Sequence, residues 1–354
     1  TESHKKYGYR LAEIYEKLKA IPRAIAQYQK NIKLFPDDFR NYEKLNVLLI
    51  EGKKYGTAQV ILLKATKQPT CPNILFKKLA QAYSFQNKKK AAAMAYEQYL
   101  RNDLNDSLAW YEYGSLYYSL KIYKKAIGPL VKAVELMPLH SASLNKLTDS
   151  YIKTGDLAKA VHLLQKKFDQ DSSNENVLLE LANVYKREKK DQKVAEIYEK
   201  LFDSNPDKYK KYIVEAGNIY YKIPIKEKAY TVYYKFISLA FKDPVVSINL
   251  AEMEYEKKRY QRVIFLLRDL EGKYAKDSRV VNMLALSIIQ TGTQNLSIPE
   301  INQMVSKAPN NKNVIEMAAI AYDKKEDLNS AAKMYTRFLA FPKTESHKKY
   351  GYRL

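Results

Sequence analysis

The chain has 354 residues and a formal net charge of +22, because 61 lysines and arginines outnumber 39 aspartates and glutamates. Hydrophobic residues make up 46% of the sequence, which is typical of a folded protein and argues against intrinsic disorder. No apolar run approaches the roughly 18 residues of a membrane-spanning helix, and the single cysteine, Cys71, excludes an internal disulfide. We therefore expect a soluble protein, and the composition does not distinguish a cytoplasmic from a periplasmic one.

In chain order, the sequence repeats with a period of 34 residues, lengthened once to 35 before Ala229. A small apolar residue marks the second helix of each expected helix pair. We expect this residue to lie in the middle of that helix, where a short side chain lets a neighbouring helix come close. Ser297 is the exception at its position. The residues that follow the rule are Ala24, Ala58, Ala92, Ala126, Ala160, Val194, Ala229, Val263 and Ala331.

The first helix of each pair carries its own marker, a mostly apolar residue followed by a small one. An aromatic residue comes three positions after the small one in seven of ten repeats. The small residues are Ala12, Asn46, Ala80, Gly114, Thr148, Ala182, Gly217, Ala251, Ala285 and Ala319. The aromatic residues are Tyr15, Tyr83, Tyr117, Tyr151, Tyr185, Tyr220 and Tyr322. Proline, which stops a helix, occupies the end of four repeats, at Pro36, Pro138, Pro206 and Pro309.

Residues 108–138, LAWYEYGSLYYSLKIYKKAIGPLVKAVELMP, show the pattern most fully. The W-x2-Y-G-x2-Y string from Trp110, the A-x3-L-x2-A string from Ala126 and the closing Pro138 resemble a tetratricopeptide unit, a helix–turn–helix of 34 residues. The resemblance implies an all-α fold, a right-handed superhelical α-solenoid of about ten such units. It implies a single solenoid over residues 1–343.

Three repeats depart from the pattern. Leu49 and Glu254 replace the usual tyrosine in the second and eighth repeats. In the ninth repeat, Thr291-Gly292-Thr293 leads to Pro299, which falls near the start of the expected second helix. We expect that helix to be shortened or shifted, because proline fits the first turn of a helix but not its interior.

Residues 344–354, TESHKKYGYRL, are identical to residues 1–11. Three explanations remain open. The copy is an artefact of chain assignment, a cap that covers the open end of the solenoid as the start of a further helix, or a segment that continues the solenoid head-to-tail in another molecule.

The sequence shows no catalytic or metal-binding constellation. The four histidines are scattered, no two are spaced as metal ligands on a helix, and no phosphate-binding glycine motif occurs. We therefore expect no enzymatic activity, no cofactor and no metal.

The inner face of the first helices lines the concave groove in tetratricopeptide proteins, so the resemblance implies that a partner protein or peptide binds there. Tyrosine and asparagine on that face suit such a role, because they contact and hydrogen-bond a peptide backbone without demanding one sequence. The expected groove residues are Tyr9, Lys77, Tyr111, Ser115, Tyr118, Asn145, Asn183, Lys186, Asn218, Tyr221 and Tyr255, with Gln81 and Ile248 at equivalent positions.

Some tetratricopeptide domains clamp the C-terminal carboxylate of a chaperone with a fixed set of lysine, asparagine and arginine residues. Here Asn218, Asn249 and Arg279 match part of that set, while Val214 and Met283 stand at the remaining places. The comparison therefore disfavours chaperone tails as partners.

The excess of lysine suggests a second surface, because a net charge of this size attracts acidic partners. We expect the lysines to lie in the turns within the helix pairs and to form a basic edge. They could also be an ordinary solvated surface. Nucleic acid is the second choice of partner after protein, and an anionic membrane surface is the third. The edge residues are Lys53, Lys54, Lys88, Lys89, Lys90, Lys124, Lys125, Lys189, Lys190, Lys257, Lys258 and Arg259.

Overall fold

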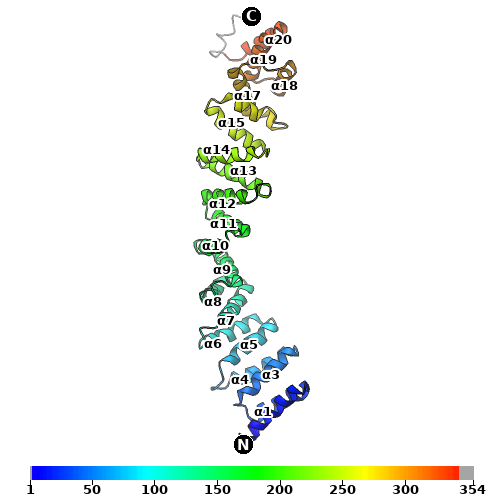
Figure 1. Cartoon of the computed structure of the whole chain (residues 1–354), viewed down its shortest axis with the longest axis vertical. Coiled ribbons are helices and arrows are strands. Elements are labelled where there is room, and N and C mark those ends of the chain that lie inside the picture. The colour runs from blue at the N-terminus through cyan, green and yellow to red at the C-terminus, as the bar shows by residue number, and fades with distance from the viewer. Residues whose placement is uncertain (1, 343–354) are drawn as a thin grey trace. The chain divides into compact units, whose positions relative to one another are not determined.

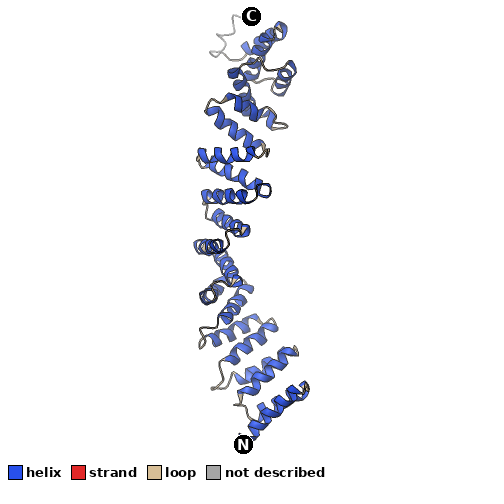
Figure 2. Ribbon diagram, viewed as in Figure 1, coloured by secondary structure: helices blue, strands red, loops and turns tan. Residues whose placement is uncertain are grey.

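A computed structural model describes residues 2–342 of the chain. Over these residues it contains twenty α-helices and one short 3-10 helix, and no β-strand (Figures 1 and 2). The chain divides into two compact units, Thr1–Glu188 and Lys189–Leu354. Within each unit consecutive helices pack on one another. The predicted all-α solenoid fold is therefore confirmed, while a single solenoid over residues 1–343 stays a prediction.

Odd-numbered helices are the first helices of the predicted repeats, and even-numbered helices are the second. The first unit contains α1 (Glu2–Lys17), α2 (Ile21–Leu34), α3 (Phe39–Glu51), α4 (Tyr55–Ala65), α5 (Ile74–Phe85), α6 (Lys89–Leu100), α7 (Ser107–Ser119), α8 (Tyr123–Leu136), α9 (Ser141–Thr154), α10 (Leu157–Gln170) and α11 (Glu175–Arg187).

The second unit begins with the second helix of the sixth repeat. It contains α12 (Asp191–Ser204), α13 (Pro206–Lys222), α14 (Lys226–Ser238), α15 (Pro244–Glu256), α16 (Tyr260–Leu267), η1 (Tyr274–Lys276), α17 (Ser278–Thr291), α18 (Ile298–Lys307), α19 (Lys312–Lys324) and α20 (Leu328–Leu339).

The small marker residue of each second helix is buried, but it lies earlier in the helix than predicted. Ala24 is the fourth residue of α2, and Ala126 is the fourth residue of α8. The other seven that follow the rule hold the same place, and all nine are at most 3% exposed. The short turn brings the first turn of the second helix, rather than its middle, against the first helix.

That short turn has the same backbone conformation in most repeats. One residue takes a positive φ, as at Lys53 (54°), Lys121 (59°) and Gly155 (88°), and such residues are spaced 34 apart along the first five repeats. The amide of the next residue donates to a carbonyl oxygen five positions earlier, for example from Ile122 to Tyr117 at 2.9 Å. This is the Schellman motif, which satisfies the last carbonyl groups of a helix.

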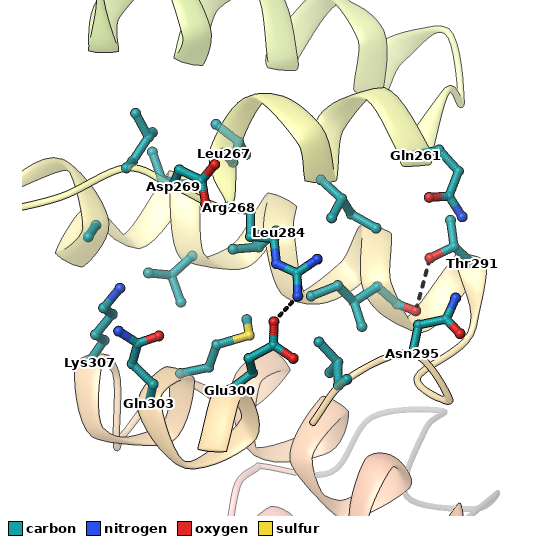
Figure 3. A pocket seen from close by; sticks show the side chains of 18 of the residues that line it. Gln261, Leu267, Arg268, Asp269, Leu284, Thr291, Asn295, Glu300, Gln303 and Lys307 are labelled. Atoms are coloured by element: carbon teal, nitrogen blue, oxygen red, sulfur yellow. Dashed lines mark hydrogen bonds and ion pairs between the residues drawn. The ribbon is translucent and has the colours of Figure 1, made fainter. Parts of the chain in front are cut away.

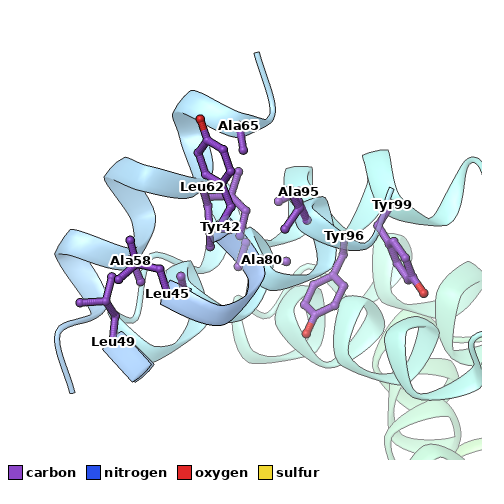
Figure 4. Packing of buried hydrophobic residues seen from close by; sticks show 14 of the residues in the cluster. Tyr42, Leu45, Leu49, Ala58, Leu62, Ala65, Ala80, Ala95, Tyr96 and Tyr99 are labelled. Atoms are coloured by element: carbon purple, nitrogen blue, oxygen red, sulfur yellow. The ribbon is translucent and has the colours of Figure 1, made fainter. Parts of the chain in front are cut away.

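The core follows the markers of both helices. Figure 4 shows part of it in the first unit, where α3 and α4 pack against α5 and α6. Leu49, which replaces a tyrosine, is only 1% exposed and fills that place in the core. The labelled side chains in the figure are Tyr42, Leu45, Leu49, Ala58, Leu62, Ala65, Ala80, Ala95, Tyr96 and Tyr99.

The predicted irregularity of the ninth repeat is confirmed. Its second helix, α18, has only 10 residues and starts at Ile298, after Ser297. Ser297 is the N-cap and forms a capping box with Glu300, while Pro299 lies in the first turn. The N-cap therefore stands where other repeats already have their fourth helical residue, and the helix begins one residue later. Helix α16 in the preceding repeat is shorter still, with 8 residues, which the sequence analysis did not anticipate.

The other departure, Glu254 on α15, is buried and has several partners. It is 1% exposed and lies 3.2 Å from Arg262 and 3.5 Å from Arg259, and it accepts a hydrogen bond of 2.8 Å from Tyr230. A carboxylate replaces the usual tyrosine here because two guanidinium groups and a phenol compensate its charge.

Among the described residues, no helix is long and apolar enough to cross a membrane. The copied segment, residues 344–354, lies outside the described residues, so its three explanations stay open.

Candidate partner-binding surface

In the first unit, the predicted groove residues Tyr111 and Tyr118 of α7 form a cluster around Lys146 of α9, while Asn145 of α9 accepts a hydrogen bond from Lys167. The Lys146 ammonium group lies 5.1 Å from the ring centre of Tyr111 and 5.8 Å from that of Tyr118, and it donates to the Tyr111 hydroxyl at 3.0 Å. The edge of the His140 ring packs on Tyr111, with 4.8 Å between ring centres. A half-buried cation held between two aromatic rings is a typical way to fix their orientation.

Tyr118 also links α7 to the next first helix. Its hydroxyl donates to the Asp149 carboxylate at 2.9 Å. Burial, followed by this hydrogen bond, raises the pKa of Tyr118 to about 12. The phenol therefore stays protonated at neutral pH and acts as a fixed donor between neighbouring repeats.

A cavity of about 240 Å3 with several polar side chains in its lining lies between α9 and α11, next to this cluster. The predicted groove residues Asn145 and Asn183 both line it, together with Asp149, Arg187 and Thr148. Thr148 is 2% exposed, and within the described residues its hydroxyl has no hydrogen-bond partner. A buried hydroxyl without a partner costs stability, and because its oxygen is itself covered, a ligand atom can reach it only if the wall of the cavity shifts.

The remaining groove residues of the first unit lie apart from this cavity. Lys77 forms an ion pair with Asp106 at 2.5 Å, and Tyr9 packs under the Arg40 guanidinium at 4.7 Å. The Ser115 hydroxyl is buried and, among the described residues, unpartnered. Lys186 is exposed, one residue before Arg187.

In the second unit, the groove residues Asn218 and Tyr221 bond to side chains on the neighbouring helices α14 and α15. Asn218 accepts from the Tyr233 hydroxyl at 2.7 Å and from Asn249 at 3.2 Å. Tyr221 donates to Glu252 at 2.6 Å, and the raised pKa of Tyr221 follows from burial and this hydrogen bond. Much of their bonding capacity is therefore used within the protein.

Two further second-unit positions are filled by packing. Tyr255 packs edge-on against Tyr260, with 5.6 Å between ring centres. Ile248 is only 5% exposed, so its expected place on the groove surface is wrong: the side chain belongs to the core around α15 and α16.

The partial chaperone-clamp set is also engaged within the second unit. Arg279 lies 3.4 Å from both Glu252 and Asp277, and Asn249 donates to Asn218. These contacts compete with an incoming carboxylate.

The basic edge divides into turn residues and helix residues. Lys53 and Lys54 lie in the turn before α4, and Lys88 caps α6. The prediction that all these lysines lie in turns is wrong for four of them, because the helices begin earlier than expected. These four occupy the first helical turns of α6 and α8: Lys89, Lys90, Lys124 and Lys125.

The edge residues also differ in their partners. Lys257 and Arg259 have carboxylates nearby, Glu227 at 3.6 Å and Glu254 at 3.5 Å. In the first unit, Lys88 bonds to Gln59 at 2.7 Å. In the described part of the chain, most edge lysines form no ion pair within 4.0 Å: Lys53, Lys54, Lys88, Lys89, Lys90, Lys124, Lys125, Lys189 and Lys258. Lys189, Lys190 and Lys258 lie in the corresponding turns of the second unit.

Among the described residues, neither surface contains a group of side chains suited to bind a metal ion. Within residues 2–342, no cluster of three histidine, cysteine or acidic side chains is placed to hold an ion. The described groove offers hydroxyl, amide and ammonium groups.

The sequence analysis missed the cavity between α9 and α11. It found Asn145 and Asn183 but assigned Thr148 only to helix packing. Its position in the small-residue slot was visible in the sequence, and a hydroxyl in a slot otherwise held mostly by alanine and glycine was the available signal.

Two tetratricopeptide-repeat family models match the chain, one over residues 8–38 and one over residues 77–143. The chain therefore contains tetratricopeptide repeats over these residues. The repeat is generally a non-catalytic scaffold for protein–protein interactions. No curated protein sequence matches the chain.

Several solved structures resemble this chain. YrrB, described as a tetratricopeptide protein with an unusual peptide-binding site, is 19% identical; the match covers 48% of this chain and 88% of YrrB, with a TM-score of 0.41. A tetratricopeptide repeat protein from Parabacteroides merdae is 17% identical over 70% of this chain and 98% of its own, with a TM-score of 0.40. Naa15/Naa10 bound to HypK-THB matches at 15% identity over 94% of this chain and 52% of that chain, with a TM-score of 0.43.

Proposed function

We propose that this protein is a non-catalytic scaffold that binds a segment of a partner protein in the groove of its first unit, along α7, α9 and α11. One observation carries the proposal: the buried, unpartnered hydroxyl of Thr148 in a cavity flanked by Asn145 and Asn183. A hydroxyl and two amides supply both donors and acceptors for a peptide backbone.

The neighbouring cluster supplies the apolar part of the contact. Tyr111 and Tyr118 are half-buried and held by Lys146 and Asp149, so their rings are fixed before a ligand arrives. Fixed rings lose little entropy on binding, and tyrosine is enriched at binding hot spots. The proposed order of importance is therefore the cavity with its two flanking amides, then the two rings, then the exposed Lys186.

The test uses Thr148→Val, which keeps the side-chain volume and removes the hydroxyl. We expect opposite effects on two measurements. Stability in urea should stay equal or rise, because an unsatisfied buried group is removed. Affinity for a partner captured from source cells, measured by calorimetry, should fall by about tenfold, since one hydrogen bond to the ligand is lost.

Ser287→Ala is the matched control. Its hydroxyl on α17 is also buried and, among the described residues, unpartnered, but it lies in the second unit. This variant should affect stability in the same direction and leave affinity unchanged. Unchanged affinity of Thr148→Val, with Tyr118→Ala also binding normally, would show that the partner does not use this groove.

The basic edge is a second candidate surface, favoured by the unusual placement of its lysines. A positive charge in the first turn of a helix opposes the helix dipole, yet Lys89, Lys90, Lys124 and Lys125 all stand there. Lys125 lies over the Tyr117 ring at 5.8 Å, whereas an acidic partner or a phosphate backbone would account for the other three lysines.

Salt distinguishes the two surfaces. Binding to phosphates weakens steeply with salt, by about one power of salt concentration for each phosphate contact. Reversal of Lys88, Lys89 and Lys90 to glutamate should abolish such binding and leave binding in the groove unaffected. Acidic peptide, nucleic acid and anionic membrane are then separated by direct titration with each.

A further inference from the structure

The second unit contains a cavity that results from its two short helices. It has a volume of about 290 Å3 and lies between α16, α17 and α18 (Figure 3). Helix α16 ends after 8 residues and α18 begins late, at Ile298, so neither covers the middle of α17. The apolar part of the lining comes from Ile264, Leu267, Leu284, Ile288 and Met304.

The rim of the cavity carries charges of both signs. Arg268 and Glu300 form an ion pair across it, and Asp269 and Lys307 lie at its edge (Figure 3). Two positive and two negative groups leave the rim without a net charge, although the chain carries +22. Two such rims can therefore face each other without strong repulsion.

Phe265 lies on α16, the helix that contributes Ile264, Leu267 and Arg268 to this cavity, while its own ring lines a neighbouring hollow with Tyr234 and Leu250. Phe265 is 79% exposed, more than any other large hydrophobic side chain in the described part of the chain. Its neighbours in sequence, Ile264 and Leu266, are partly buried, so the ring projects from an otherwise packed helix. A cavity of about 150 Å3 already admits a benzene ring, so a phenyl ring fits into this one.

We propose that α16 forms a two-fold interface with α16 of a second copy of this chain, in which Phe265 of each copy enters the cavity of the other. The ring and part of its receptor site lie on α16, so one surface of each copy can supply both halves of a self-complementary, closed contact. The residues of this interface are not residues of the first-unit groove. The dimer can therefore be tested independently of the proposed partner binding.

Two variants of the full chain break the contact in different ways. Phe265→Ser removes the ring and leaves the cavity open. Gln303→Trp places a bulky side chain at the exposed rim on α18 and blocks the cavity, while Phe265 remains. We expect each variant alone to dimerise about 100-fold more weakly than the wild type in sedimentation equilibrium, because two buried rings are lost in each case.

Mixing the two variants provides the decisive measurement. The open cavity of Phe265→Ser can accept the ring of Gln303→Trp, which restores one of the two contacts. The mixture should therefore form a mixed dimer of intermediate affinity. Leu139→Ser is the control, since it removes a side chain that is also exposed, at 77%, but lies in the first unit, and it should leave dimerisation unchanged.

Salt gives an independent check. Two chains of +22 repel each other, so dimerisation through an apolar contact should tighten as salt screens the repulsion. A wild-type protein that stays monomeric at all accessible concentrations and salt levels would overturn the proposal. So would a mixture of variants no tighter than either alone, or a different protein that occupies the cavity in the monomer.

Discussion

Gly114 on α7 faces Leu130 on α8 at a distance that leaves no room for a side chain. A Cβ atom at position 114 would lie 2.7 Å from Leu130 Cγ and 3.2 Å from its backbone nitrogen. Gly217 is in the same position against Tyr233, whose ring would lie 2.4 Å from a Cβ atom. In both repeats the absence of a side chain sets how closely the two helices approach.

We therefore predict that Gly114→Ala lowers the free energy of unfolding by about 1–3 kcal/mol, because the helices must move apart. Gly56→Ala is the matched control on α4, where a Cβ atom meets nothing within 4 Å. It should raise stability by up to about 1 kcal/mol through helix propensity. Urea denaturation of both variants measures the difference, and equal effects would contradict the packing at Gly114.

The sequence predicted the burial of individual residues more accurately than it predicted the contacts that those residues make. The repeat period identified Gly114, Thr148 and Ala126 as buried, because a solenoid repeats the same packing in every unit. It could not show that the Thr148 hydroxyl lacks a partner, since that depends on which side chains the next repeat brings across. The same limit applies to Ile248, whose slot lies in the groove by register but whose side chain enters the core.

At the scale of the element, the turn between paired helices recurs with little variation while its residues do not. Lysine occupies the left-handed position at five places, among them Lys53 and Lys121, and glycine occupies it at Gly155. A left-handed backbone is unfavourable for residues with a Cβ atom. These turns therefore carry a recurrent local cost.

We predict that Lys121→Gly raises the free energy of unfolding by about 1 kcal/mol, since glycine adopts a positive φ without this cost. Lys124→Gly, three residues later and inside α8, should lower it by about 0.5–1 kcal/mol, because glycine is a poor helix former. Thermal unfolding monitored by circular dichroism distinguishes the two. A loss of stability in Lys121→Gly would mean that the lysine side chain has a structural role in the turn.

Of the two short helices, α16 and α18, only the shortening of α18 was predictable from the sequence. Pro299 and the preceding glycine and threonine residues indicated the late start of α18, because proline restricts where a helix can begin. Nothing comparable marks the early end of α16. Its sequence continues as RDLEGKY, in which the first glycine is Gly272, five residues after the helix ends at Leu267. The cavity between these helices depends on both ends and so was not foreseen.

At the scale of the whole molecule, the tyrosines act as hydrogen-bond donors to carboxylates. Tyr118, Tyr220, Tyr221 and Tyr230 each donate to an aspartate or glutamate on another helix. Burial and these bonds raise the tyrosine pKa, to about 12 in Tyr118. Tyr233 also reaches about 12, mainly through burial. The 31 tyrosines thus contribute to structure as well as to the proposed groove.

The pKa shifts predict a loss of stability at alkaline pH. The folded-state pKa lies above the ordinary value of 10.0, so the neutral phenol is favoured in the folded state. This contribution is fully present below pH 10 and disappears as the pH rises toward 12. Tyrosinate absorbance and helix content should therefore change together in this range. Tyr118→Phe should flatten the pH dependence of stability, and an unchanged slope would contradict the assignment.

The polar pairs that join successive first helices have a mechanical consequence. Tyr118–Asp149, Tyr221–Glu252 and Asn218–Asn249 are each 31 residues apart and lie on the predicted groove side. Each is a single net hydrogen bond of about 1 kcal/mol, whereas the apolar contacts behind it are far more numerous. Stretching the groove side of a unit would break these hydrogen bonds first and reversibly. The apolar core would stay packed and would restore them when the force is removed. Within each unit, the groove can thus open one pair of successive first helices at a time to admit a larger ligand.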